Sequence, residues 1–440
     1  MTERIPCISL DCTATILPTT AAKTGGYCMP CYQAIEREAH MRYVEDNRKT
    51  VDLYAGVTNP VEILKIMYTP RTYDELIKYV PAPLTEEQLY LQLDRRQMME
   101  MEQYAKEKWL LGDENVGWRI LLSLSCYRDY IISDEMLLLV LQGSYNAAIL
   151  FRNAPDSIRS QCLAQIEVDK NKRHALLLAL AWIGDDQVVQ QFNQWRHNPP
   201  SWANEMFIPV EKFSYEAGWE LTAEGKRQDL FLPVNYAIEY RNDHNENNAE
   251  RQEQDHFHNN DHVEFKLLAP SKHICAWCGG ELTKLIELGS QHASVKELGW
   301  PYPYITIETC LNCSAYGEIF MEMNENGEGI WSKYNRKPSY LPELDEEAIT
   351  FTLKETFKLA QQPRALYHSA EWMLEGTNSQ IGGHPAWIQD AYYPTCPCCS
   401  KKMTFIGQVD FEQVVEGYEG IYYMFVCAED QLTTTLFQQT

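Results

Sequence analysis

The chain has 440 residues, of which 45% are hydrophobic, and its formal net charge is −24 from 38 basic and 62 acidic residues. This length predicts two to four domains, and the acidic balance argues against a nucleic-acid-binding protein, which needs a basic surface. No stretch approaches the about 20 apolar residues of a transmembrane helix, and residues 1–6 lack the apolar core of a signal peptide. The charge suits either a partner with a basic face or a generally soluble acidic protein.

Residues 1–33 contain the first of two cysteine quartets. Cys7, Cys12, Cys28 and Cys31 read C-x4-C-x15-C-x2-C, and two such elements can close a tetrahedron of thiolates around Zn²⁺. Few apolar residues lie between them, so we expect a metal-dependent module of loops and short hairpins, with a turn at Gly25-Gly26. Fourteen cysteines at such spacings without an export signal favour metal over disulfides and a cytoplasmic location.

Residues 34–200 have the pattern of helices separated by short breaks. Gly184-Asp185-Asp186 breaks the chain, with one of the two aspartates as N-cap, and Val188, Val189, Phe192 and Trp195 share one face of the helix that follows. Paired helices with tight turns indicate a HEAT-like α-solenoid, and a compact helical bundle is the alternative. The expected helices are 61–67, 86–110, 118–128, 134–141, 157–166, 174–183 and 185–195; Cys126 and Cys162 lie in apolar helical patterns and are expected core thiols.

In residues 205–440, glycines and prolines separate short apolar runs that we expect to be strands. The expected strands are 207–210, 219–222, 230–239, 305–309 and 319–323. The second quartet lies here, because Cys275, Cys278, Cys310 and Cys313 read C-x2-C-x31-C-x2-C. A four-thiolate shell leaves no open coordination position, so both quartets predict structural zinc and no catalysis. Residues 241–262 are almost purely polar, and we expect a disordered loop there.

The knuckle at Cys275 is repeated later in the chain. Cys396 and Cys399 are followed by Met403-Thr404 and an apolar strand, as Cys278 is followed by Leu282-Thr283. Cys427 and Asp430 then take the places of the third and fourth ligands. A carboxylate can bind Zn²⁺ through oxygen, so a third site is possible as Cys3Asp; a decayed site, or use of the extra Cys398, are the alternatives. The repeat predicts a duplicated β-rich zinc-knuckle domain.

The segment Gln380–Gln389, with Cys396-Pro-Cys-Cys399 and the strand 403–408, resembles the YwqG-like family of bacterial proteins. The resemblance covers about residues 205–440, and Ala217–Leu221 and Leu298–Trp300 are similar to other parts of that pattern. Asp430 departs from it, since zinc-bearing members have a second cysteine there. With the HEAT-like segment and the N-terminal module, the chain is similar to predicted immunity proteins of bacterial polymorphic toxin and type VI secretion systems.

The chain lacks the common hydrolase, metalloprotease, P-loop and dinucleotide-binding motifs. His384 could be a zinc ligand or a general base, although a turn-ordering role is the simpler interpretation. We therefore expect an α+β multidomain protein that is not an enzyme. The resemblance implies an immunity protein that occludes a secreted, basic toxin domain. A protein-binding scaffold is one alternative, and a zinc-dependent hydrolase that uses the third site and reverses a toxin modification is another.

Overall fold

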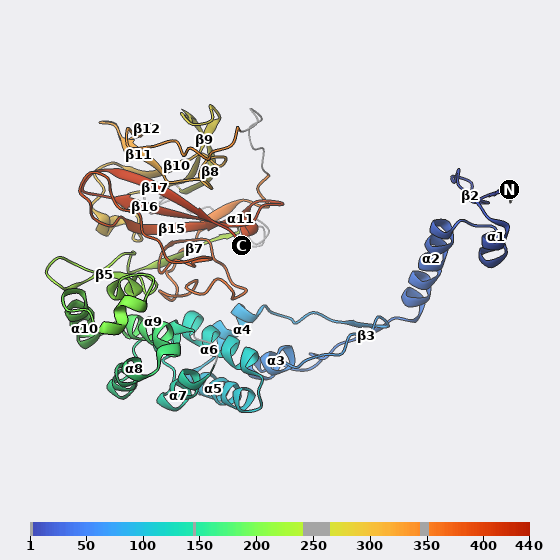
Figure 1. Cartoon of the computed structure of the whole chain (residues 1–440), viewed down its shortest axis with the longest axis horizontal. Helices are drawn as coiled ribbons and strands as arrows, with labels where there is room; N and C mark the ends of the chain where they lie inside the picture. The colour runs from blue at the N-terminus through green and yellow to red at the C-terminus, as the bar shows by residue number, and fades with distance from the viewer. Residues whose placement is uncertain (1–2, 144–146, 241–264, 344–351) are drawn as a thin grey trace, which may run out of the picture. The chain divides into compact units, whose positions relative to one another are not determined.

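The computed structural model describes residues 3–143, 147–240, 265–343 and 352–440, and its contacts divide the chain into two compact units, residues 1–85 and 86–440. Helices and strands are mixed, as predicted (Figure 1). The described helices are all too short or too polar to cross a lipid bilayer. The polar segment 241–262 lies outside the described residues, so its predicted disorder stays a prediction.

The N-terminal unit is small, and its helices begin at prolines. Pro18 and Pro30 stand in the first turns of two helices that the expectation of loops and hairpins missed, since a proline presets the backbone at that position. The predicted turn is confirmed, because Gly25 and Gly26 both have positive φ. The elements are β1 (Ile5–Pro6), β2 (Thr15–Ile16), α1 (Pro18–Thr24), α2 (Met29–Asn47), β3 (Lys49–Val51), α3 (Pro60–Met67) and β4 (Ile77–Tyr79); β1 pairs with β2 and β3 with β4.

The second unit begins with helices close to the predicted ranges. The expected helix 86–110 is broken, because the Asp94 side chain accepts from the Gln97 backbone N–H and starts a new helix. The predicted aspartate N-cap of the last long helix is confirmed and is Asp185, whose side chain accepts from the Val188 N–H. These helices are α4 (Glu86–Gln92), α5 (Arg95–Leu110), α6 (Glu114–Arg128), α7 (Asp134–Gln142), α8 (Asp156–Val168), α9 (Arg173–Ile183) and α10 (Asp186–His197).

The helices bury the side chains that their periodicity indicates. Cys126 of α6 and Cys162 of α8 are fully buried, so the prediction of core thiols is confirmed. The predicted apolar face of α10 is buried as well. The predicted strand at 207–210 is wrong: Phe207 is fully exposed, and a 3₁₀ helix, Val210–Tyr215, begins after Pro209.

Two antiparallel sheets form most of the rest of the unit. A three-stranded sheet has the order β10-β9-β8, and an eight-stranded sheet has the order β12-β11-β17-β16-β15-β14-β7-β13. Strands β5 (Trp219–Leu221) and β6 (Arg227–Asp229) form a separate hairpin, and α11 (Phe411–Val414) is one turn. The sheet strands are β7 (Asn235–Tyr240), β8 (Phe265–Ile274), β9 (Glu281–Gly289), β10 (Tyr304–Thr309), β11 (Ile319–Met323), β12 (Gly329–Trp331), β13 (Phe357–Leu359), β14 (Gln380–Gly382), β15 (Thr404–Asp410), β16 (Ile421–Cys427) and β17 (Leu432–Gln438).

One buried cluster joins the two sheets. Leu285 and Ile307 of the smaller sheet share it with Val409 and Met424 of the larger sheet, and all four are fully buried. The inner faces of the two sheets therefore form a common core. The strands predicted at 305–309 and 319–323 are present, as β10 and β11.

The helices and the sheets belong to one unit because the loops of the C-terminal part pack on the helices. The Trp219 indole donates to the Ala181 carbonyl at 2.8 Å, and the His368 ring lies 2.7 Å from the Glu87 carboxylate. The contact boundary falls between Thr85 and Glu86, where the sequence indicated none. The predicted divisions 1–33, 34–200 and 205–440 stay predictions about independent folding.

Candidate metal centres

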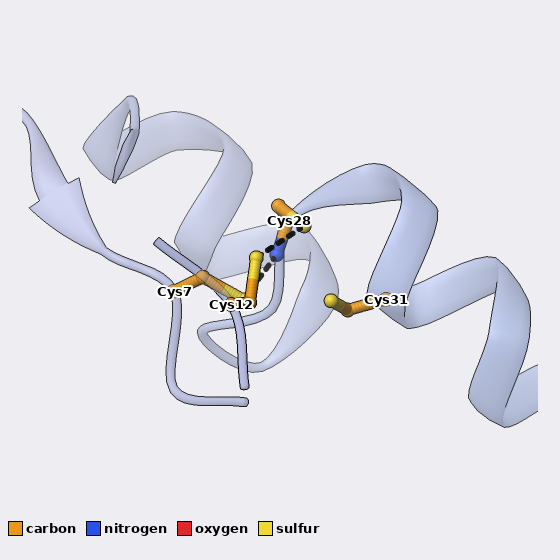
Figure 2. Close-up of side chains that lie close together, drawn as sticks. All are labelled: Cys7, Cys12, Cys28 and Cys31. Atoms are coloured by element: carbon orange, nitrogen blue, oxygen red, sulfur yellow. Dashed lines mark hydrogen bonds between the residues drawn. The ribbon is translucent and has the colours of Figure 1, made fainter. Parts of the chain in front are cut away.

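The first quartet gathers around the start of α2. Cys7 and Cys12 lie on the loop between β1 and β2, Cys28 is the N-cap of α2, and Cys31 is in its first turn (Figure 2). The four sulfur atoms lie within 4.8 Å of one another. The Cys28 backbone N–H donates to Cys7 Sγ at 3.2 Å, which stabilises a thiolate at that position.

The second quartet lies between β8, β9 and β10. Cys275 and Cys278 stand on a tight turn after β8, in which the Gly279 N–H donates to the Cys275 carbonyl at 2.8 Å and Gly279 has a φ of +80°. Cys310 and Cys313 follow β10 directly. Their sulfur atoms also lie within 4.8 Å of one another, and Cys313 is fully buried.

The third group contains the residues that the repeat indicated. Cys396 and Cys399 stand on a turn before β15, Cys427 ends β16, and Asp430 follows three residues later. One oxygen of the carboxylate, Asp430 Oδ2, lies 3.1 Å from Cys396 Sγ and 3.3 Å from Cys427 Sγ. Asp430 therefore presents a single ligand atom to the three thiols.

The spacing of the sulfur atoms fits a tetrahedral metal ion. Zn–S bonds of about 2.3 Å place two sulfur ligands about 3.8 Å apart, whereas a disulfide needs about 2.05 Å. The Cys12–Cys28, Cys275–Cys313 and Cys399–Cys427 sulfur pairs are separated by 3.6, 3.8 and 3.7 Å. The three groups can therefore each hold one metal ion, and none of these pairs is a disulfide.

Each group favours one anion among its four ligands. Backbone N–H donation lowers the pKa of Cys7 to about 7, and hydrogen bonding with Cys310 lowers the pKa of Cys275 to about 5. In the third group burial raises the pKa of Cys427 to about 11, while hydrogen bonds from Cys399 and Cys396 hold the pKa of Asp430 below its usual value. The carboxylate thus takes the place of the ionised thiol.

The second and third groups lie in segments of matching geometry, which we call the first knuckle segment (residues 265–323) and the second knuckle segment (residues 380–438). Ser400 has a φ of +63° at the position of Gly279, and its N–H donates to the Cys396 carbonyl at 2.9 Å. Leu285 is an extra, unpaired residue in the β9–β10 ladder, ten positions after Cys275. Ile406 is the same extra residue in the β15–β16 ladder, ten positions after Cys396.

The outer faces of the two knuckle segments differ. In the second, Trp387 and Tyr393 cover the sheet, and the Trp387 ring stacks on Tyr423 with centroids 4.6 Å apart. In the first, the equivalent face is a hollow of about 590 Å³. Positions in the two segments can be matched by their distance in sequence from the equivalent cysteines. By this count the hollow is lined by Lys284, Glu287, Thr306 and Glu308, and the matching residues of the second segment are Phe405, Gln408, Tyr423 and Phe425.

The cover is present in the second knuckle segment because its first strand connects to the knuckle by a longer path. Leu267 pairs with β9 at the position where Ile381 pairs with β15 in the other segment. Cys275 follows Leu267 by eight positions, whereas Cys396 follows Ile381 by fifteen. The longer connection carries Trp387 and Tyr393.

The hollow contains a carboxylate–imidazole pair that the sequence analysis missed. Glu308 is 3% exposed, and its Oε2 lies 2.7 Å from His273 Nδ1. Such a bond fixes the orientation of the imidazole ring. Glu287 is held by Lys266 at 2.7 Å and Lys284 at 2.5 Å. Most of the described lining residues are charged or polar, so the hollow is equipped to bind a polar ligand.

Comparison with known proteins gives one informative match. The uncharacterized protein YpfL of Salmonella typhimurium (strain LT2) is 36% identical over 450 residues, an alignment that covers 100% of both chains. The chain belongs to the YpfL family. No protein-family model matches it, and no solved structure matches it. The resemblance to the YwqG-like family therefore stays a prediction.

The structure brings together the twelve predicted metal ligands of this YpfL-family chain in the three predicted groups. That they bind metal stays a prediction. His384 belongs to none of the three groups; it is 1% exposed, and its ring nitrogens lie 2.9 Å from the Pro385 carbonyl and 3.0 Å from the Glu216 carbonyl. Cys398 is exposed and outside the third group, where Asp430 stands in its place.

Proposed function

We propose that the three groups bind Zn²⁺ and hold loops in place. Thiolate-rich tetrahedral sites favour zinc, and four protein ligands leave no position for a substrate. The buried positions of Cys275, Cys310 and Cys313 support a structural role for the second group. Metal analysis of purified protein tests this: three zinc ions per chain are expected, and zinc-free folded protein would contradict it.

We also propose that the protein is non-catalytic and binds another protein through the hollow of the first knuckle segment. One observation carries this proposal: the equivalent face of the second knuckle segment is covered by polypeptide of the same chain. There the backbone N–H of Ala386 donates to Gln408 Oε1 at 2.9 Å. In the first segment Glu287 holds the position of Gln408. Its carboxylate therefore lines the hollow at the place where a covering chain would donate a backbone N–H hydrogen bond.

The proposed partner is a secreted bacterial toxin domain with a basic surface, and the chain acts as its immunity protein in the cytoplasm. The net charge of −24 supports this choice, since acidic side chains attract a basic partner and speed encounter. The resemblance to YwqG-like immunity proteins supports it as well. The acidic stretches at 243–261 and 345–347, which are further candidate contacts, lie outside the described residues.

The helices α4–α10 are proposed to be HEAT-like. Two features support this: α5 packs on α6 and α8 on α9, and short connections join them. Part of their surface is already in use, because Trp182 of α9 contacts the rings of Tyr367 and His384. A partner would therefore use the hollow or the remaining helix surface.

Co-expression with the toxin encoded beside the gene tests the proposal. Growth should be rescued and a complex should co-purify, more weakly at high salt. Glu328→Lys, at the hollow, should weaken the complex, whereas Glu135→Lys should leave it unchanged. The two carboxylates are matched, since each is exposed and paired with one lysine, at 2.7 Å to Lys272 and 2.6 Å to Lys106. Absence of rescue favours the alternative, a cytoplasmic protein-binding scaffold.

A second candidate is a zinc-dependent hydrolase that reverses a toxin modification at the third group. The carboxylate ligand and the partial exposure of Cys399 and Asp430 favour it, because an oxygen ligand can give way to water. Cys427→Ala separates the candidates. Loss of one zinc ion with loss of thermal stability supports a structural site, whereas lost turnover in a stable protein supports catalysis.

A further inference from the structure

A pocket of about 330 Å³ lies on the inner side of the second knuckle segment, beside α11 and the ends of β16 and β17. Four of its lining residues are aromatic, and no lysine or arginine is among them. The lining residues are Leu311, Phe411, Gly417, Tyr418, Glu419, Tyr422, Phe437 and Gln439.

The aromatic rings are arranged around one another. Tyr422 lies between Phe411 and Phe437, with ring centroids 4.6 Å from each. Tyr418 stands edge-on to Phe411, at 6.5 Å and 80°. Tyr422 and Phe411 are each 3% exposed and form the floor, whereas Tyr418 and Phe437 are only partly buried and form the walls.

The backbone holds these walls in position. Gly420 has a φ of +100°, and a side chain there would lie 2.6 Å from the Phe437 ring, so glycine is needed for the ring's approach. The Phe411 N–H donates to the Gly420 carbonyl at 2.9 Å, which ties the turn that carries Tyr418 to α11. These contacts fix the positions of the Tyr418 turn and the Phe437 ring.

The pocket is electrostatically suited to a cation. The faces of aromatic rings attract positive charge, and the Glu419 carboxylate is exposed at the rim. Within the described parts of the chain, the cation–π contacts involve other rings, such as Tyr54, Trp202 and Tyr367. The four pocket rings thus have no such cation from the described chain itself.

The floor is poor in hydrogen-bond acceptors. The Tyr422 hydroxyl is already bonded, with Ser314 Oγ and the Leu311 carbonyl each at 3.3 Å. A primary ammonium would bring N–H groups that the floor does not satisfy, whereas a fully methylated nitrogen brings none. We infer that this pocket is a binding site for the quaternary ammonium group of a small molecule. This inference does not depend on the proposed toxin-binding role.

The test uses the purified full chain, with choline and its neutral isostere 3,3-dimethylbutan-1-ol as probes in calorimetry and ligand-observed NMR. Choline should bind about tenfold more tightly than the neutral compound, because only the charge differs. Tyr418→Leu, which keeps an apolar wall, should abolish that preference. Glu419→Gln should weaken choline and leave the neutral compound unchanged; Glu419 is exposed, so this variant keeps the fold.

Tyr340→Leu is the matched control, because Tyr340 is an exposed tyrosine outside the pocket, and it should change nothing. Equal binding of the two probes, or no binding of choline, overturns the inference. So does a choline affinity that Tyr418→Leu and Glu419→Gln both leave intact. Tighter binding of lysine amide than of choline would assign the pocket to a protein side chain instead.

Discussion

The two knuckle segments share a knuckle, a bulge and an inner core, but only one has its outer face covered. In the second, aromatic side chains of the connection before Cys396 pack on Phe405 and Phe425. In the first, Lys284 and Glu308 stand at those positions and face a hollow. The same scaffold therefore carries a buried core on one copy and an accessible polar surface on the other.

This difference shows where each copy obtains its stability. The covered copy gains from the burial of large aromatic side chains, each of which removes much apolar surface from water. The open copy has no such layer over its hollow, so we expect it to depend more heavily on its four clustered cysteines. Four experiments can break or sharpen this comparison.

The largest effect is expected from Cys310→Ser. A structural zinc ion contributes of order 10 kcal/mol, which is comparable with the whole stability of a domain, about 5–15 kcal/mol. The variant should lose one metal ion and the fold of residues 86–440, as judged by native mass spectrometry and near-ultraviolet circular dichroism. Cys427→Ser should lose one ion with a smaller loss of stability. Cys398→Ser, at an exposed cysteine outside the groups, is the control.

Truncation of the cover should have the next largest effect. Trp387→Ala should lower the free energy of unfolding by about 3–5 kcal/mol, because it leaves a cavity against Tyr423 and Phe425. Lys284→Ala, on the open face, should cost less than about 1 kcal/mol, since it removes only a partly exposed ion pair. Equal losses in urea unfolding would mean that the two faces do not differ in this way.

The predicted ligand Asp430 allows a test that does not require unfolding. Asp430→Cys should make the third group retain zinc more strongly against a chelating dye, because thiolate is the softer ligand. Asp430→Ala should weaken zinc retention by more than about tenfold. Substitution of a residue that only hydrogen-bonds a metal ligand already reduces metal affinity by about that factor. If neither substitution alters zinc release, Asp430 does not bind the metal.

The smallest effect concerns pH. Burial opposes ionisation of Glu287, but hydrogen bonds from Lys266 and Lys284 lower its pKa below 4.5. The ionised Glu287 side chain therefore stabilises the fold above that pH, and its contribution falls as the pH falls. Burial raises the pKa of Glu216, whose carboxylate accepts from the Ala391 N–H, so its ionisation costs stability as pH rises. As pH rises toward 4.5, Glu287→Gln should lose stability relative to the parent protein. As pH rises above 4.5, Glu216→Gln should gain stability relative to the parent protein. Slopes of the same sign in urea unfolding would contradict this assignment.

Local signals in the sequence predicted the elements that local chemistry decides. Cysteine spacing grouped the twelve predicted metal ligands, including Asp430, and the Asp185-Asp186 pair indicated the start of α10. The prediction of a strand at 207–210 was wrong because an apolar run that contains a proline, here Pro209, does not distinguish a strand from the start of a 3₁₀ helix.

Features that depend on distant pairing were not predictable. The hollow is lined by residues from Lys266 to Gly329, and which of them face outward depends on the bulge at Leu285. The contact of His368 with Glu87 joins residues 281 positions apart. Such contacts follow from the docking of helices on the sheet loops, which no periodicity encodes.

The pairing of β11 has a consequence for how the chain can be divided. This strand belongs in sequence to the first knuckle segment, yet it pairs with β17 of the second, with Ile319 opposite Thr435. The Thr434 hydroxyl also donates to the Ile319 carbonyl at 3.0 Å. A chain severed between β12 and β13 would yield two fragments that each lack a neighbouring strand and recover it from the other. The two fragments are therefore candidates for fragment complementation. Replacing one fragment with that of a relative should weaken the assembly, because the β11–β17 pairing joins the two.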